Sequence, residues 1–290
     1  MSITLSDLNT NQRSAVEWDV GPLLVLAGPG SGKTAVLTLR IANLIRNSPE
    51  ENHRILGLTF TVKAADEMQS RIRDILGDDS RRIQLRTFHS FCTDILRQHG
   101  SQLGLRPDFQ VITDEKDRIV ILKDLNDSDQ VEVEDPEGSL KQIDTMFTHG
   151  ITPDELPRYF KDGQEDQCRA LQNVFLGYMK RLVDENQLDF GSMLHLTREL
   201  LESKPRIARQ VRTVYRYVCV DEFQDTNLAQ YKVLRLLCPE ATSNLFVVAD
   251  DDQIIFQWNG ADPKRLEELK SDYSPEIIQL PENYRCPAEV

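Results

Sequence analysis

The chain has 290 residues, of which 40% are hydrophobic, and its formal net charge is −13. This length and apolar content suffice for one large or two small globular domains. There is no apolar run of about 18 residues and no basic-then-apolar leader, so we expect neither a membrane-spanning helix nor a signal peptide. The five cysteines include no C-x-x-C pair, which argues against zinc and disulfide frameworks and predicts a cytoplasmic protein with reduced thiols.

The negative charge is concentrated in one part of the chain. Residues 106–189 contain 20 acidic and 10 basic residues, so −10 of the −13 lies there. DNA-binding proteins bind largely by neutralising phosphates, and an evenly acidic chain would argue against that function. Because the flanking parts are nearly neutral, the net charge does not exclude a nucleic-acid partner.

The first part of the chain alternates between predicted strands and helices. A helix begins near Leu8, with Thr10 or Asn11 available as its N-cap. Apolar runs and helical periodicity then predict strands at Leu23–Leu26, Ile55–Phe60 and Ile83–Thr87, and helices at Ala35–Ile45, Lys63–Leu76 and Phe88–Gln98. This alternation indicates an α/β fold with a parallel, doubly wound sheet that binds ligands at the carboxyl ends of its strands.

The pattern changes between residues 106 and 189, where helical stretches predominate. They are Glu115–Leu125, Ser139–Phe147 and Gln164–Glu185. Alternation then resumes with strands at Tyr215–Val220, Leu245–Ala249 and Ile277–Leu280, and helices at Leu228–Leu237 and Pro263–Lys270. We therefore predict a discontinuous core domain at 1–105 and 190–280, interrupted by an acidic, all-helical insertion at 106–189.

A glycine-rich loop follows the first predicted strand and precedes a helix. It contains Ala27, Gly28, Pro29, Gly30, Ser31, Gly32, Lys33 and Thr34. This is the order of elements that a phosphate-binding loop requires, because glycines let backbone N–H groups turn inward towards a phosphate. Lys33 would reach the β and γ phosphates, and the Thr34 hydroxyl would bind Mg²⁺. Ala27 stands where the general pattern of phosphate-binding loops has glycine. Taken alone, the segment from Ala27 to Thr34 could also be an ordinary glycine-rich turn.

Two carboxylates follow the predicted strand Tyr215–Val220. Asp221 and Glu222 would lie at the same sheet edge as the glycine-rich loop. There Asp221 would hold Mg²⁺, directly or through water, and Glu222 would orient and deprotonate the attacking water. The alternative is a pair of ordinary surface acids.

Taken together, the motifs resemble those of UvrD/Rep/PcrA-like superfamily 1 DNA helicases over nearly the whole chain. The segments that carry the resemblance are Leu8–Gln12, Ala27–Thr34, Thr59–Met68, Thr87–Phe91, Leu188–Phe190, Asp221–Asn227, Ala249–Ala261 and Asn283–Arg285. The first motif of that family also begins with alanine. The resemblance implies a RecA-like ATPase core that uses ATP and Mg²⁺. It also implies movement from 3′ to 5′ on single-stranded DNA or at junctions with duplex DNA, in DNA repair or replication.

The resemblance also implies roles for individual residues. Gln12 and Tyr284 would contact adenine, while Gln253 and Arg285 would contact the γ-phosphate, acting with Lys33 and Glu222 in catalysis. The implied DNA contacts are Phe60, Thr61, Lys63, Thr87, His89, Phe256 and Trp258. Aromatic side chains at such positions stack on bases of any sequence. Core packing is the alternative for the aromatic residues, and a structural role is the alternative for His89.

Several positions depart from the family pattern. Val62 replaces the usual Asn, Ala249 the usual Gly, Ile254 the usual Ser and Asn259 the usual Arg, and Gly191–Ser192 stand where two acids are common. Because Lys33, Thr34, Asp221 and Glu222 are unaffected, we expect the chemistry of ATP hydrolysis to be intact. We expect DNA binding, or the coupling of hydrolysis to DNA movement, to be altered.

The last residues resemble the start of the family's second core domain. We therefore interpret 281–290 as the beginning of that domain and the chain as a partial one, poorly active alone. Two other functions stay open: a nucleotide- or DNA-sensing module that does not unwind DNA, and an ATPase that works with a nuclease in a repair or defence complex.

Overall fold

The computed structural model describes residues 5–48, 52–128, 131–239, 243–250, 262 and 264–284. Its backbone packs into two compact units. The first unit consists of Met1–Phe88, Arg206–Asn227 and Leu234–Val290, and the second of His89–Pro205 and Leu228–Val233. These limits differ from the predicted division at 105/106 and 189/190, and the functional domain boundaries stay a prediction.

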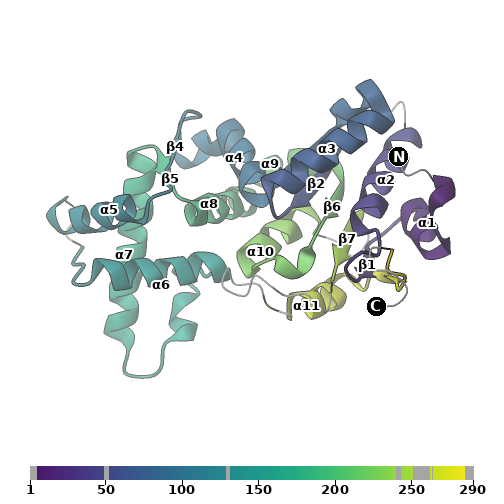
Figure 1. Cartoon of the computed structure of the whole chain (residues 1–290). Coiled ribbons are helices and arrows are strands. Elements are labelled where there is room, and N and C mark those ends of the chain that lie inside the picture. The colour runs from purple at the N-terminus through teal and green to yellow at the C-terminus, as the bar shows by residue number, and fades with distance from the viewer. Residues whose placement is uncertain are drawn as a thin grey trace. The chain divides into compact units, whose positions relative to one another are not determined.

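The elements follow the predicted order closely (Figure 1). The helices are α1 Thr10–Glu17, α2 Lys33–Arg46, α3 Val62–Leu76, α4 Phe88–His99, α5 Glu115–Ser128, α6 Pro136–His149, α7 Glu165–Asp184, α8 Phe190–Ser203, α9 Pro205–Val214, α10 Leu228–Leu237 and α11 Lys264–Tyr273. The strands are β1 Leu23–Ala27, β2 Arg54–Thr59, β3 Ile83–Thr87, β4 Gln110–Val111, β5 Gln187–Leu188, β6 Tyr215–Val220, β7 Leu245–Ala249 and β8 Glu276–Leu280.

A six-stranded parallel sheet forms the centre of the first unit, as the alternation predicted. Its order is β3-β2-β6-β7-β1-β8, and each neighbouring pair is parallel. Parallel strands all end at the same edge of a sheet. The segments that follow β1, β6 and β7 are therefore brought together even though they are far apart in the sequence.

Apolar side chains bury this sheet on both faces. Residues of α1, α2 and α3, such as Val16, Ile41 and Met68, pack with Val25 and Val248 of the sheet in one hydrophobic core. Strands β1, β2 and β7 are nearly continuous runs of buried residues, which is typical of parallel sheets covered by helices on both sides. This continuity explains why the strands could be located from the sequence.

The N-cap of α1 is Asn9, and the prediction of Thr10 or Asn11 was wrong. The Asn9 side chain accepts a hydrogen bond from the Gln12 backbone N–H at 2.8 Å. The Gln12 side chain in turn accepts from the Asn9 backbone N–H at 3.1 Å. This reciprocal capping box uses Gln12 at the third helical position, and it starts α1 at Thr10.

The second unit is mainly helical, with one short ladder that the sequence did not reveal. Strands β4 and β5 pair in parallel, with Gln110 opposite Gln187. Two-residue strands carry too little alternation to be detected as a pattern. Helices α8 and α9 were also not assigned from the sequence, because the resumption of the α/β pattern was expected there.

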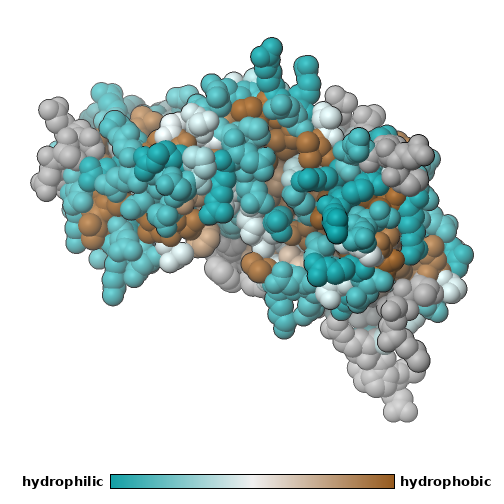
Figure 2. Space-filling model, turned by 90° about the horizontal axis from the view of Figure 1, so that it is seen from above, coloured by the Kyte–Doolittle hydropathy of each residue, from teal (hydrophilic) through white to brown (hydrophobic). Residues whose placement is uncertain are grey.

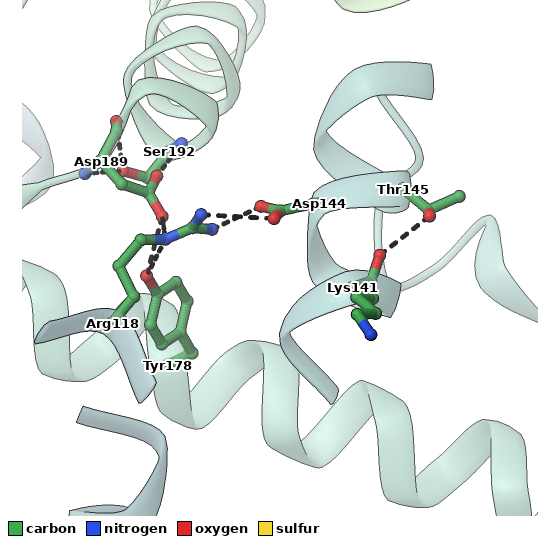
Figure 3. A network of polar contacts seen from close by, with 7 residues as sticks. All are labelled: Arg118, Lys141, Asp144, Thr145, Tyr178, Asp189 and Ser192. Atoms are coloured by element: carbon green, nitrogen blue, oxygen red, sulfur yellow. Dashed lines mark hydrogen bonds and ion pairs between the residues drawn. The ribbon is translucent and has the colours of Figure 1, made fainter. Parts of the chain in front are cut away.

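A buried polar network ties α5, α6, α7 and the start of α8 together (Figure 3). Arg118 donates to the carboxylate of Asp144, and its Nε lies 2.9 Å from Asp189 Oδ2. Tyr178 donates to the same Asp189 oxygen at 2.7 Å, while Ser192 N–H donates to the other at 2.7 Å. Burial and the nearby Asp189 raise the pKa of Tyr178, so this hydroxyl keeps its proton and acts as a donor.

Hydrophilic and hydrophobic residues are interspersed on the surface that is visible in one view of the molecule (Figure 2). Hydrophilic residues predominate on the face in Figure 2, with scattered hydrophobic patches between them. Among the described helices, none combines the length and apolar character needed to cross a membrane.

Gly191 explains one departure from the family pattern. A Cβ atom at this position would lie 2.2 Å from Cδ2 of Phe147, which is far inside van der Waals contact. Phe147 is buried, and its ring centroid is 5.3 Å from that of Phe175 and 5.9 Å from that of His195. The ring therefore fills the space that a side chain at 191 would occupy. Ser192, in turn, completes the N-terminal cap of α8 with Asp189.

We predict that Gly191→Asp destabilises the protein by about 1–3 kcal/mol, because overpacking outweighs the favourable charge at a helix N-terminus. Urea denaturation of the wild type, Gly191→Asp, Phe147→Leu and the double variant measures this as a double-mutant cycle. We expect Phe147→Leu to relieve part of the cost of Gly191→Asp. Additive effects of the two substitutions would contradict the proposed packing.

Candidate functional site

The loop after β1 has the backbone conformation that a phosphate-binding loop needs. Gly30 and Gly32 have φ angles of 78° and 87°, in the left-handed region that glycine adopts without strain. Gly32 is the N-cap of α2, and Ser31 Oγ donates to the Gly28 carbonyl at 2.7 Å. Lys33 and Thr34 therefore open α2, whose N-terminal N–H groups suit an anion.

Ala27 closes β1 and is compatible with this turn. It is 2% exposed and pairs with Leu280 of β8, so its methyl group is buried in the sheet. After it, Gly28 to Gly32 form the turn itself, in which Pro29 is exposed.

Gln12 joins the start of α1 to this loop. It is 5% exposed, and its Nε2 donates to the Ser31 carbonyl at 2.9 Å. Because its Oε1 accepts from Asn9 N–H, the orientation of the amide is determined from both sides. A Cβ on Gly32 would lie 2.9 Å from Gln12 Nε2, so the close approach of loop and amide also requires glycine here.

Tyr284 lies against the same loop. Its backbone N–H donates to the Gly30 carbonyl at 2.9 Å. Asn9 Nδ2 donates to the Tyr284 hydroxyl at 2.7 Å, and that hydroxyl donates to Glu282 at 2.5 Å. Tyr284 is 58% exposed, which leaves much of its surface accessible beside the loop.

Lys33 lies between two acidic side chains. Its Nζ is 2.9 Å from Asp250 Oδ2 and 3.6 Å from Glu222 Oε2. Asp250 is fully buried at the end of β7. A charge this deeply buried requires a partner, and Lys33 supplies it. The ammonium group is thus held at the carboxyl edge of the sheet, next to the loop.

Gln224 connects the two acids. Its Nε2 donates to Glu222 Oε2 at 2.7 Å, and its Oε1 accepts from Asp250 N–H at 3.0 Å. Glu222 has a φ of 48°, an uncommon conformation for a non-glycine residue that costs about 1–3 kcal/mol and is often found at functional sites. This backbone conformation turns the chain sharply after β6.

Asp221 and Asp225 present buried carboxylate oxygens at the same edge. Within the described part of the chain, Oδ1 of each has no hydrogen-bond partner. Burial, followed by the charge of Glu222, raises the pKa of Asp221 to about 7 and that of Asp225 to about 6. Unsatisfied carboxylate oxygens of this kind are suitable ligands for a divalent cation.

Four candidate DNA contacts lie at the ends of β2 and β3. Phe60 follows β2 directly, and Thr87 is the last residue of β3. Thr61 caps α3 by accepting from Ala64 N–H at 3.1 Å. Lys63 is strongly exposed, with Glu67 at 4.0 Å. The parallel sheet therefore brings all four to the same edge as the glycine-rich loop.

His89 belongs to the second unit and contacts an aromatic residue there. Its ring lies edge-on to Phe190, with the centroids 5.2 Å apart. Burial lowers the pKa of His89, so its neutral form is favoured and one ring nitrogen can donate. Phe190 is 49% exposed, and it was quoted within a motif without a role of its own.

Gln253, Phe256, Trp258 and Arg285 lie outside the described residues, and their roles stay predictions. The structure adds Asn9, Gln224 and Asp250 to the candidate site, which were quoted within motifs but given no role. Asp250 could have been found from its place directly after a buried strand, as Asp221 was. The contacts of Asn9 with Tyr284, 275 residues later, have no local sequence signal.

Comparison with known proteins identifies the family. Residues 8–274 match the UvrD/REP helicase N-terminal domain. The chain belongs to the UvrD/Rep helicase family. It is 36% identical over 289 residues to the ATP-dependent DNA helicase PcrA of Staphylococcus aureus (strain Mu50) and 35% identical over 288 residues to that of Staphylococcus epidermidis (strain RP62A). These alignments cover 98% of this chain but 39% of each relative.

We predict that Asn9→Ala weakens nucleotide binding, because it removes the side-chain contacts that cap α1 at the Gln12 backbone N–H and hold the Tyr284 hydroxyl. The nucleotide KM should rise several-fold with little change in kcat, and loss of the cap should cost about 1 kcal/mol of stability. Steady-state ATPase assays and urea denaturation of the intact protein measure both effects. Thr10→Ala is the matched control, because Thr10 is exposed and adjacent. Equal KM values for the two variants would count against this positioning role.

Proposed function

We propose that the chain is the nucleotide-binding part of an ATP-dependent DNA helicase that couples ATP hydrolysis to movement on single-stranded DNA. The observation that carries this proposal is the cluster of Lys33, Asp221, Glu222 and Asp250 at one sheet edge, beside a glycine-rich loop. Family membership supports the choice of ATP and DNA. Movement from 3′ to 5′, a role in repair and a cytoplasmic location follow from family resemblance.

The phosphates of ATP would compete with the acids for Lys33. In the structure the Lys33 ammonium is paired with Asp250 at 2.9 Å. A β- or γ-phosphate seated on the N–H groups of the loop would present several negative oxygens to the same ammonium group. Transfer of Lys33 from Asp250 to the nucleotide would then weaken its ion pair with Asp250 and also its contact with Glu222, which is 3.6 Å long in this structure.

Glu222 is the residue best placed to handle the attacking water. Its carboxylate is held by Gln224 and lies near Lys33, while the side chain is 38% exposed and so remains accessible. As a general base it would accept the proton of the water that attacks the γ-phosphate. Withdrawal of Lys33 towards the phosphate would free Glu222 for this task.

The donor set also suits Mg²⁺ bound together with the nucleotide. Asp221 would supply a carboxylate oxygen and Thr34 a hydroxyl, with phosphate oxygens and water completing the shell. Within the described residues no group of three or more His, Cys, Asp or Glu forms a metal site by itself, which is consistent with a cation that depends on phosphate ligands. When bound, Mg²⁺ neutralises charge on the β and γ phosphates.

The edge that carries Phe60, Thr61, Lys63 and Thr87 is proposed to contact single-stranded DNA. An aromatic ring such as Phe60 binds any base by stacking, for about 1–3 kcal/mol per base. Lys63 would contact phosphates without reading sequence. In the second unit, the neutral His89 beside Phe190 offers a further donor and aromatic face. A second core domain, with Gln253 and Arg285 nearby, would complete the nucleotide site.

Two substitutions separate binding from hydrolysis. We predict that Lys33→Ala abolishes ATP binding and turnover in the intact protein. Glu222→Gln should keep nucleotide binding but lower kcat by about 10²–10⁴ through loss of the general base. Nucleotide binding by fluorescence and phosphate release give the two readouts.

Lys264→Ala, at an exposed position of α11, is the control. Thermal denaturation shows whether Lys33→Ala remains folded despite loss of the ion pair between Lys33 and Asp250. ATP turnover that is unchanged in folded Lys33→Ala would refute the assignment of the nucleotide site.

A further inference from the structure

A polar groove of about 830 Å³ lies along the outer side of β3 in the first unit. Its walls come from the C-terminal half of α3 and from β3 and the turn before it, and its principal lining residues are Gln69, Arg73, Asp78, Arg81, Gln84 and Arg86. Strand β3 is the first in the sheet order and is paired only with β2 among the described strands. The groove therefore lies at an open edge of the sheet.

The groove is positively charged although the chain is acidic. Three arginines and a single carboxylate, Asp78, line it. Asp78 lies 3.0 Å from Arg81 in an exposed pair, which contributes little energy and is easily exchanged for another anion. Among the described residues, the Arg73 side chain forms no hydrogen bond or ion pair. Among the lining residues, arginines therefore outnumber carboxylates by three to one.

Both walls begin at the edge that carries the candidate DNA contacts. Thr87 ends β3 there, and Thr61 and Lys63 lie at the start of α3, which runs back along the sheet. From Thr87 to Ile83 the strand spans about 13 Å, and from Lys63 to Arg73 the helix rises about 15 Å. Arg86 is adjacent to Thr87, while Arg73 and Arg81 lie further down. Arginines are therefore spaced along a path that leaves the DNA-contacting edge.

We propose that this groove binds the sugar-phosphate backbone of single-stranded DNA as the strand continues past Thr61, Lys63 and Thr87. The inference rests on the proposed function. Arginine forks donate pairs of hydrogen bonds to phosphate oxygens, and the amides of Gln69 and Gln84 can add donors. No aromatic residue is among the lining residues that the structure describes, so the groove holds the backbone without stacking on bases.

An acidic peptide added to the edge of β3 is the competing occupant. Arg86 Nη1 donates to the Leu85 carbonyl at 3.2 Å, so an acceptor of the β3 backbone already has a side-chain partner. A peptide strand would need such acceptors for its own main-chain hydrogen bonds. Continuity with the DNA-contacting edge and this occupied carbonyl favour DNA.

The test compares Arg73→Gln/Arg81→Gln with Arg71→Gln/Lys264→Gln in the intact protein. Both double variants remove two positive charges from exposed positions of the first unit, but the control residues do not line the groove. Fluorescence anisotropy with oligothymidylates of increasing length, each over a series of salt concentrations, measures affinity and its salt dependence. Circular dichroism checks that each variant is folded.

We expect the groove variant to lose affinity for long oligonucleotides only. The slope of log K against log[salt] should fall by about 1.4, or about 0.7 for each of two lost phosphate contacts, whereas short oligonucleotides should bind as they do to the control. Salt-dependence slopes that match those of the control at every oligonucleotide length would overturn the proposal. An equal loss of affinity at all lengths would overturn it as well. If DNA binding is unchanged while binding of poly-glutamate is lost, the groove is a protein-docking surface. A wild-type protein that binds none of the oligonucleotides would contradict the proposed function itself.

Discussion

The pairing of Lys33 with the buried Asp250 is the interaction on which the candidate site depends. Burial of a carboxylate is costly unless it is paired; Asp250 has no exposure to solvent, and the lysine of the glycine-rich loop lies 2.9 Å from its Oδ2. Glu222 and Gln224 extend this contact to the end of β6. The strand order places β7 between β6 and β1. Because these strands are parallel, the residues that follow β1, β6 and β7 meet at one edge of the sheet. The order of the parallel strands therefore determines which charged side chains lie next to Lys33.

A second set of contacts holds the other side of the loop. Asn9 caps α1, determines the orientation of the Gln12 amide and donates to Tyr284, while Gln12 and Tyr284 both bind loop carbonyls. The loop is thus held from the first helix and from the segment after the last strand. The contacts from Gln12 and Tyr284 use carbonyl oxygens of the loop and none of its N–H groups, which suits a loop whose N–H groups bind a phosphate. This arrangement brings residues from opposite ends of the chain, such as Asn9 and Tyr284, to the same loop.

Much of the fold was predictable because β1, β2 and β7 are short runs of buried, mainly apolar residues and because strands alternate with helices of clear apolar periodicity. Strands β3, β6 and β7 have the bounds that their apolar runs predicted, and α10 likewise matches its predicted range. The cap of α1 was misassigned because Asn9, Thr10 and Asn11 are all good capping residues, and only the position of Gln12 decides among them. Strands β4 and β5 are too short to show a period. The contact of Phe147 with Gly191 and that of Lys33 with Asp250 join distant segments, and local patterns carry no information about such pairs.

In the proposed mechanism, Lys33 exchanges a protein partner for the nucleotide. The most direct test is a crystal structure of the intact protein with a non-hydrolysable ATP analogue, Mg²⁺ and oligothymidylate. We predict that the analogue lies on the loop from Gly28 to Thr34, that Lys33 Nζ contacts its phosphate oxygens, and that the contact with Asp250 is lengthened or lost. An analogue bound elsewhere, with Lys33 still paired to Asp250, would contradict the account.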